Sequence, residues 1–314
     1  MPEIPVVDLS NLDAHRITNE LHQAFSTVGF VYLKNHGIDR EKVDNVFKIS
    51  RDFFQLPENV KQNYPRDKEQ FDGYTGRDQE ILEDSSVHEI REAYDVTSPT
   101  SRYPDDRVPQ FRSAICELAN SLRQLTNNLL KFMALALGKC LYSLLRLEED
   151  YLCNRHRHIF DGVDKNGTIL RSLYYPPFVG DVIVQPGVVR CGEHSDYGTI
   201  TLLLQDDTGG LEVLSGKEWI AATPIAETVL VNLGDLMQFW TSDRYVATVH
   251  RVKIPEIEIG RQSTAARQSI AFFVQPDNGV MISSLMDDDG SISQRQPVES
   301  LSYLKLRLSE TYKY

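Results

Sequence analysis

The chain has 314 residues and a formal net charge of −12, because 33 Lys and Arg stand against 45 Asp and Glu. Apolar residues make up 41% and charged residues 25%, as in ordinary globular proteins. This composition excludes a disordered, collagen-like or wholly coiled-coil chain. The acidity disfavours nucleic acid and anionic membranes as partners. A chain of this length buries enough surface to fold around a core without disulfide or metal staples.

The cysteines and the N-terminus bear on location. No CxxC pair occurs among Cys116, Cys140, Cys153 and Cys191, so neither a disulfide framework nor a thiolate zinc site is indicated. The first residues lack the basic start and apolar run of a signal peptide. No apolar stretch reaches the roughly 18 residues of a membrane span. We therefore expect reduced thiols and a cytoplasmic protein.

The first half of the chain shows mostly helical patterns. In chain order, the spacing of apolar residues predicts a strand at 4–9, a helix at 13–28 capped by Ser10 and Asn11, a strand at 30–33 and a helix at 39–56. Residues 61–110 are polar and rich in turns, and are predicted to form loops around one strand near 93–96. The longest helical pattern, at 110–147, indicates a core helix that backs a sheet.

The pattern of residues along the chain changes near residue 165. Short β-rich runs then alternate with Gly, Pro, Asn and Asp turns, which is typical of a sandwich or barrel. The expected strands cover 170–175, 182–184, 199–204, 211–213, 228–232, 245–252 and 267–275, and a helix follows at about 298–311. We find no internal repeat and no linker, so one compact unit is expected.

A candidate metal site lies in this β-rich half. His194 and Asp196 lead into the predicted strand at 199–204, and residues i and i+2 of an extended segment share a face. His250, near the end of another predicted strand, offers a second imidazole. Two imidazoles and one carboxylate suit non-haem Fe(II) and leave coordination positions open for substrates.

A basic strand completes the pattern. Arg267, Ser269 and Phe273 alternate along the predicted strand at 267–275 and so share one face. A guanidinium and a hydroxyl can hold the far carboxylate of a small diacid whose other end chelates iron. The triplet at 261–263 repeats the Arg-Gln-Ser of 267–269, but no strand follows it. Arg267 is therefore the preferred carboxylate clamp, and Arg261 is the alternative register.

Taken together, these motifs resemble a known family over nearly the whole chain. The matching segments are, in order, Ile4-Pro5-Val6-Val7-Asp8-Leu9, Gly29-Phe30-Val31-Tyr32-Leu33-Lys34-Asn35-His36-Gly37, Phe53-Phe54-Gln55-Leu56-Pro57, His194-x-Asp196, His250-Arg251-Val252 and Arg267-x-Ser269. They are similar to the Fe(II)/2-oxoglutarate-dependent dioxygenases of the isopenicillin N synthase-like family. The resemblance implies that His194, Asp196 and His250 bind iron, and that Arg267 and Ser269 hold the distal carboxylate of 2-oxoglutarate.

The segment at 171–176 resembles the Tyr-Tyr-Pro segment of the family, which implies that Tyr175 also contacts this carboxylate. Many relatives carry Asn where this chain has Leu173. Strand alternation places Arg171 on the face of Tyr175, and we predict it as a candidate anchor for an anionic or carbonyl group of the substrate. Phe273 matches a position where relatives often pack an aromatic ring against substrate.

The resemblance implies a mainly β fold, with a double-stranded β-helix (jelly roll, cupin-like) core flanked by the helices at 13–56 and 110–147. We expect four parts of one unit: an N-terminal helix and strand region at 1–110, backing helices at 111–165, a catalytic core at 166–280 and a C-terminal helix at 281–314. The implied activity is oxidation, most simply hydroxylation, of a small-molecule metabolite with O2, releasing succinate and CO2 from 2-oxoglutarate.

Three other interpretations stay open. One is an Fe(II) oxidase of the same family that does not use 2-oxoglutarate, which the loss of Asn at Leu173 favours slightly. The others are a non-catalytic metal- or small-molecule-binding jelly roll and a scaffolding protein. His156-x-His158, near Asp161, is a competing metal motif, predicted to be solvated or at a pocket rim. The primary substrate and the oligomeric state are not determined by the sequence.

Overall fold

The computed structural model describes residues 3–11, 13–77, 79–80, 91–140, 147–177, 189–254, 265–285 and 295–312. The predicted strand at 182–184 and the alternative clamp Arg261 both lie outside these residues.

Two sheets form the centre of the molecule. The strands of the larger sheet, in spatial order, are β1 (Val6–Asp8), β2 (Phe30–Lys34), β10 (Thr228–Leu233), β7 (Ile200–Gln205), β12 (Arg267–Val274), β5 (Ile169–Tyr175), β4 (Glu92–Val96) and β3 (Gly73–Thr75). The smaller sheet has the order β6 (Val189–His194), β11 (His250–Lys253), β8 (Leu211–Ser215) and β9 (Glu218–Ala221). A short pair, β13 (Met281–Ile282) and β14 (Val298–Glu299), lies apart from both.

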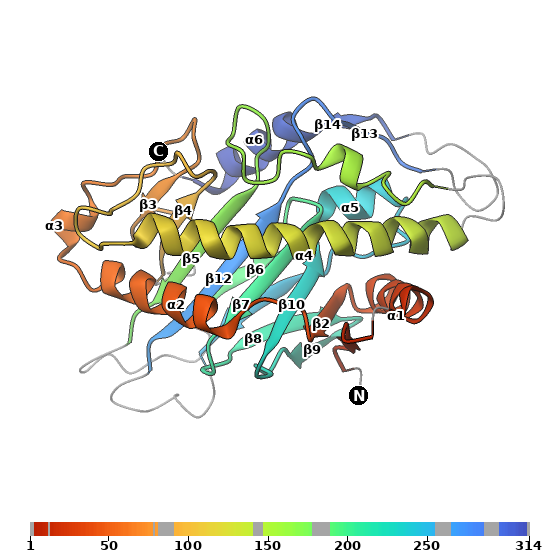
Figure 1. Ribbon diagram of the computed structural model, residues 1–314, viewed down its shortest axis with the longest axis horizontal. Coiled ribbons are helices and arrows are strands. Elements are labelled where there is room, and N and C mark those ends of the chain that lie inside the picture. The colour runs from red at the N-terminus through yellow and green to blue at the C-terminus, as the bar shows by residue number, and fades with distance from the viewer. Residues whose placement is uncertain are drawn as a thin grey trace.

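Helices α1 (Ala14–Thr27), α2 (Arg40–Phe54) and α4 (Phe111–Cys140) cover one face of the larger sheet (Figure 1). The other helices are α3 (Glu58–Lys61), α5 (Asp235–Trp240) and α6 (Ser300–Thr311), with a 3-10 turn η1 at Cys153–Arg155. Figure 1 shows α4 running across the strands with α1 and α2 beside it. No helix of the described residues is both long and apolar enough to cross a membrane.

Strand alternation separates two environments. On β12, Ile270, Phe272 and Val274 pack into the core beneath the helices. Ser269 and Ala271, between them, face a cavity enclosed on the other side by the smaller sheet. Because successive side chains of a strand point to opposite faces, the same strand builds the core and the cavity wall.

The prediction of a jelly-roll core with flanking helices is confirmed, but several details were wrong. The strand expected at 245–252 begins only at His250. Helix α1 is capped by Asp13, whose side chain accepts from the amides of His15 and Arg16, and not by Ser10 or Asn11. The elements α3, β3, β6, β9 and α5 were not predicted. They are short, so they carry little periodic signal.

Candidate active site

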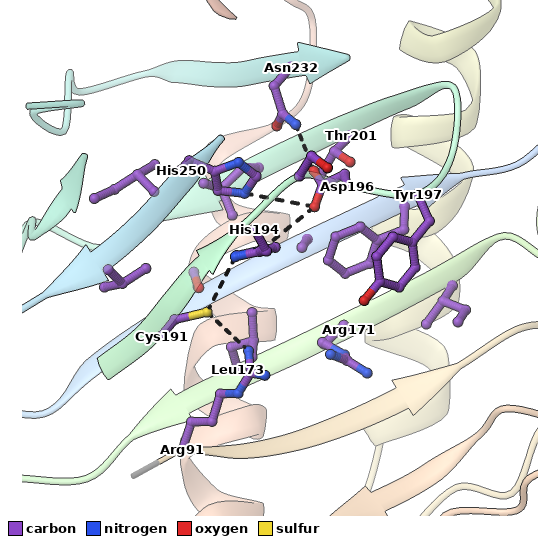
Figure 2. A pocket seen from close by; sticks show the side chains of 18 of the residues that line it. Arg91, Arg171, Leu173, Cys191, His194, Asp196, Tyr197, Thr201, Asn232 and His250 are labelled. Carbon is purple, nitrogen blue, oxygen red and sulfur yellow. Dashed lines mark hydrogen bonds and ion pairs between the residues drawn. The ribbon is translucent and has the colours of Figure 1, made fainter. Parts of the chain in front are cut away.

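The two histidines of the metal motif are brought together by strand pairing. His194 ends β6 and His250 begins β11, and the two residues lie directly opposite each other in the antiparallel ladder. Their ring centroids are 4.2 Å apart. Asp196 follows in the loop after β6, and its Oδ1 lies 3.9 Å from Nε2 of His194 and 3.7 Å from Nε2 of His250. Figure 2 shows these three side chains converging at one end of the cavity.

Backbone carbonyls orient both imidazole rings. Nδ1 of His194 lies 2.9 Å from the Gly192 carbonyl oxygen, and Nδ1 of His250 lies 3.1 Å from that of Thr248. A carbonyl only accepts, so each Nδ1 carries the proton and donates it there. Each Nε2 is thereby left as a lone-pair donor that faces Asp196. A hydrogen bond from the other ring nitrogen to a backbone carbonyl is the usual arrangement for metal-binding histidines.

The Asp196 carboxylate is buried and held from behind. Asn232 on β10 donates from Nδ2 to Oδ2 at 2.6 Å, and Thr201 on β7 donates a further hydrogen bond. Burial raises the pKa of Asp196, but the two imidazoles and these two donors outweigh it, so the pKa is lowered overall. Burial and the neighbouring His194 lower the pKa of His250 to about 4. The cluster therefore offers an ionised carboxylate beside a neutral imidazole.

This donor set fits iron. One ligand atom from each of His194, Asp196 and His250 lies within 4.8 Å of the others. Two imidazole nitrogens and one carboxylate oxygen form the facial triad of non-haem Fe(II) oxygenases. Within the described ranges, no other group of three or more His, Cys, Asp and Glu side chains is close enough to hold a metal.

The two histidines of the competing metal motif, His156 and His158, lie in different environments. His156 is buried, which corrects the prediction that it is solvated. Its Nδ1 lies 2.8 Å from the Leu152 carbonyl oxygen and its Nε2 lies 3.0 Å from Oγ1 of Thr199. His158 is exposed and pairs with Asp161 at 3.2 Å. Both nitrogens of His156 are thus engaged within the protein.

The basic strand supplies the opposite end of the same cavity. Arg267 is 1% exposed, and its Nη1 donates to Oγ of Ser269 at 3.2 Å while Nε donates to the Gly209 carbonyl at 2.9 Å. Its guanidinium carbon lies 5.0 Å from the ring centre of Tyr175. Tyr175 and Arg267 are cross-strand neighbours on β5 and β12. The structure thus gathers these three predicted residues, and Leu173, opposite Ser269, lines the cavity as an apolar residue.

Arg171 and Phe273 line a third part of the cavity. The guanidinium of Arg171 forms a fork with Asp95, from Nε to Oδ1 at 2.7 Å and from Nη2 to Oδ2 at 2.8 Å. It also donates from Nη1 to both oxygens of Glu80 at 3.0 and 3.2 Å. The predicted anchor therefore faces the cavity but already holds carboxylates of the protein.

Among the cavity-lining residues that sequence reasoning missed are Asn232, Thr201, Glu80, Arg91 and Cys191. Arg91 donates from Nη1 to the Cys191 sulfur at 3.3 Å, and that sulfur lies 3.9 Å from Nδ1 of His194. Asn232 sits in a strand whose alternation places it on the cavity face, so period-2 counting could have found it. Arg91 contacts Cys191, which is far away in the sequence, so no local sequence pattern around Arg91 indicates its place in the site.

Two family comparisons cover most of the chain. Residues 4–114 match the N-terminal region described as "non-haem dioxygenase in morphine synthesis". Residues 166–276 match the 2OG-Fe(II) oxygenase superfamily. A UPF0676 protein of Schizosaccharomyces pombe is 32% identical over 99% of this chain and 94% of its own length. The 2-oxoglutarate-dependent dioxygenase gloF of Glarea lozoyensis is 30% identical over 96% of this chain and 95% of its own.

Solved structures agree with these matches. A full-length Neurospora crassa protein crystallised with alpha-ketoglutarate superposes with a TM-score of 0.84 at 29% identity, over 98% of this chain and 96% of that one. A 2OG-Fe(II) oxygenase family protein of Caulobacter crescentus gives 0.81 at 26% identity, over 99% of both chains. With the buried His-Asp-His cluster and the cationic end of its cavity, the chain belongs to the 2OG-Fe(II) oxygenase superfamily and is an oxidoreductase that uses Fe(II), 2-oxoglutarate and O2.

Proposed function

We propose that this protein hydroxylates a small-molecule metabolite while 2-oxoglutarate is converted to succinate and CO2. One observation carries the proposal: a single cavity is lined both by the His-Asp-His cluster and by the buried Arg267 and Ser269. A diacid that binds iron through its 2-oxo acid end needs a cation at the far end. The cavity offers that cation on the central strand β12.

His194, Asp196 and His250 would hold the iron. Fe(II) bound there supplies the oxygen chemistry that breaks an unactivated C–H bond. The protein keeps both Nε2 atoms and one carboxylate oxygen directed at a common point. Asn232 donates to Oδ2 of the carboxylate, which leaves Oδ1 available to the metal, and Thr201 donates a further hydrogen bond to the same group.

Arg267, Ser269 and Tyr175 would hold the distal carboxylate of 2-oxoglutarate. A buried guanidinium and hydroxyl give charge-assisted hydrogen bonds worth about 1.5–3 kcal/mol each. Burial of Arg267 and Tyr175 excludes water from this end, so the carboxylate is held in one orientation. Leu173 leaves the adjacent position of the cavity apolar.

The substrate is a small molecule. The Neurospora crassa neighbour has been solved with thymine and with 5-formyluracil beside alpha-ketoglutarate. In this chain Arg171 and Phe273 are the proposed substrate-side residues. The acidic balance of the chain supports a metabolite over nucleic acid or membrane. In the described part of the chain, Cys116, Cys153 and Cys191 are in no disulfide, which supports a cytoplasmic location.

The test is an anaerobic titration of apo-protein with Fe(II) and then 2-oxoglutarate, monitored through the visible metal-to-ligand charge-transfer band. Arg267→Ala should weaken 2-oxoglutarate binding, and Arg261→Ala is the matched control. Succinate is then measured after oxygen is admitted.

A band weakened only by Arg267→Ala, followed by succinate, supports the proposal. Bound iron without a band, or oxygen use without succinate, would contradict the proposal. A band weakened only by Arg261→Ala would show that the wrong register was chosen.

A further inference from the structure

A protein carboxylate occupies the side of the cavity next to the metal cluster. Arg91, directly before β4, and Arg171, on the neighbouring strand β5, both line the cavity, and Glu80 lies between them. Arg171 donates from Nη1 to both Glu80 oxygens, and Nη2 of Arg91 lies 3.3 Å from Oε1. Figure 2 shows Arg91 and Arg171 on the side of the cluster opposite Asn232. Two guanidinium groups therefore converge on one carboxylate at the cavity wall.

The two arginines are held independently of Glu80. Asp95 is fully buried and engages Nε and Nη2 of Arg171 as a fork, so this guanidinium keeps its orientation without Glu80. Arg91 has a second contact from Nη1 to the Cys191 sulfur. The Arg171 Nη1 group that donates to Glu80, and the Arg91 guanidinium within ion-pair distance of it, are thus pre-positioned for a carboxylate, whichever molecule supplies it.

Glu80 binds there as a full anion. It is 8% exposed, and burial alone would raise its pKa, but the charges of Arg171 and Arg91 lower the pKa to about 2. The site therefore accepts a buried negative charge, and an exchange of one carboxylate for another leaves the charge of the wall unchanged. A neutral group in the same place would remove the carboxylate that the two guanidinium groups share, while Arg171 would keep its fork with Asp95.

The surroundings define the rest of the ligand. Ile169, Phe273, Leu304 and Leu308 line the cavity beside the arginine pair, the last two from α6. The Cys191 sulfur connects Arg91 to the neighbourhood of His194. A molecule anchored at the arginines would therefore extend an apolar body along these side chains, close to the metal ligands.

We propose that the primary substrate is a small carboxylic acid with an apolar body, and that its carboxylate replaces Glu80 between Arg91 and Arg171. Glu80 is then a stand-in that occupies the subsite when substrate is absent. This inference rests on the proposed function, because the acid would present its C–H bond to the iron of that site. It also gives Arg91, which the sequence did not indicate, a role in substrate selection.

The test compares acids with their neutral amides on holoenzyme loaded with Fe(II) and saturating 2-oxoglutarate under anaerobic conditions. The probes are phenylacetate with phenylacetamide, hexanoate with hexanamide, and cyclohexanecarboxylate with its amide. Dissociation constants are measured by ligand-observed NMR for wild type, Glu80→Gln and the double variant Glu80→Gln, Arg91→Gln. Glu20→Gln, which removes an exposed partner of Arg16 on α1, is the control.

In Glu80→Gln, the competing carboxylate is gone, so at least one acid should bind tenfold or more tightly than in wild type, while its amide changes less than threefold. Adding Arg91→Gln should reverse the gain, and Glu20→Gln should change nothing. Glu80→Asp, which withdraws the carboxylate by one methylene, should give an intermediate gain and serves if Glu80→Gln is poorly folded.

Equal gains for acid and amide, or a gain that survives Arg91→Gln, would overturn the proposal. So would the absence of acid binding in every variant at millimolar concentration. The charge-transfer band of the same samples reports iron and 2-oxoglutarate binding separately, so failure of the proposed function is distinguishable from failure of the carboxylate subsite.

Discussion

Replacing Asn232 by leucine should weaken metal binding without unfolding the protein. The side chain is 3% exposed, and leucine has a similar size, so the volume is kept while the donor to Asp196 is lost. The lost hydrogen bond is short, at 2.6 Å, and charge-assisted, which corresponds to about 1.5–3 kcal/mol. Thr201 still donates to the same carboxylate. We therefore expect metal affinity to fall by about 10- to 100-fold, the usual range for such supporting residues.

The measurement is the dissociation constant of Co(II), from its visible absorption, at constant pH. Thr201→Val should give a loss of similar kind, since it removes the other donor. Gln62→Leu is the control, because Gln62 also donates an amide hydrogen to a carboxylate, Glu58, but away from the cavity. A Co(II) affinity within twofold of wild type in a folded Asn232→Leu variant would refute the idea that Asn232 positions Asp196.

Three further outcomes are expected. Arg267→Gln should raise the KM for 2-oxoglutarate at least tenfold in a succinate assay and leave Co(II) affinity within twofold. A matching loss of metal affinity would contradict a role confined to the cosubstrate. Burial lowers the pKa of His156 from 6.5 to about 4, so the unfolded chain takes up this proton more readily than the folded protein. Stability is therefore lost as the pH falls from 6.5 towards 4, by about 3 kcal/mol. Urea melts of His156→Gln should lack this part of the pH dependence, and an unchanged pH profile would count against it. Gly198→Ala should destabilise the fold by about 2 kcal/mol or more, because the new Cβ would lie 2.3 Å from the Val274 carbonyl oxygen and 2.7 Å from Nε2 of Gln275. An unchanged thermal melting temperature would show that the backbone there can move aside.

Local patterns accounted for much of the fold and for the faces of the strands. The helical spacing at 110–147 predicted α4, and the alternation of Arg267 and Ser269 placed both on the cavity face. These features depend on periodicities of the chain itself. The strand at 245–252 was predicted too long, because the β-prone residues before His250 are not part of a strand, although the Val249 carbonyl accepts one backbone hydrogen bond from Leu214 of β8.

The contacts of His156 show why the burial of a single side chain was harder to predict than the position of a helix or strand. Its sequence neighbours are polar, with Arg155 and Arg157 on either side. In the fold its ring lies against Trp240 of α5 and bonds to Thr199 at the start of β7. Both partners are remote in sequence, so no local signal distinguished this histidine from an exposed one.

The sequence by itself determined the chemistry that the cavity can carry. It shows a His-x-Asp motif before a predicted strand, a second histidine near the end of another predicted strand and an arginine on a third, in an order that resembles one family. These depend on residue type and on alternation over a few residues. Only the tertiary structure decided which groups act on which. Strand pairing placed His250 opposite His194. Packing of distant segments placed the Asn232 amide against Asp196, and the guanidinium groups of Arg91 and Arg171 around the Glu80 carboxylate. Such contacts arise between segments far apart in the chain, where packing and burial, and no local periodicity, decide the neighbours.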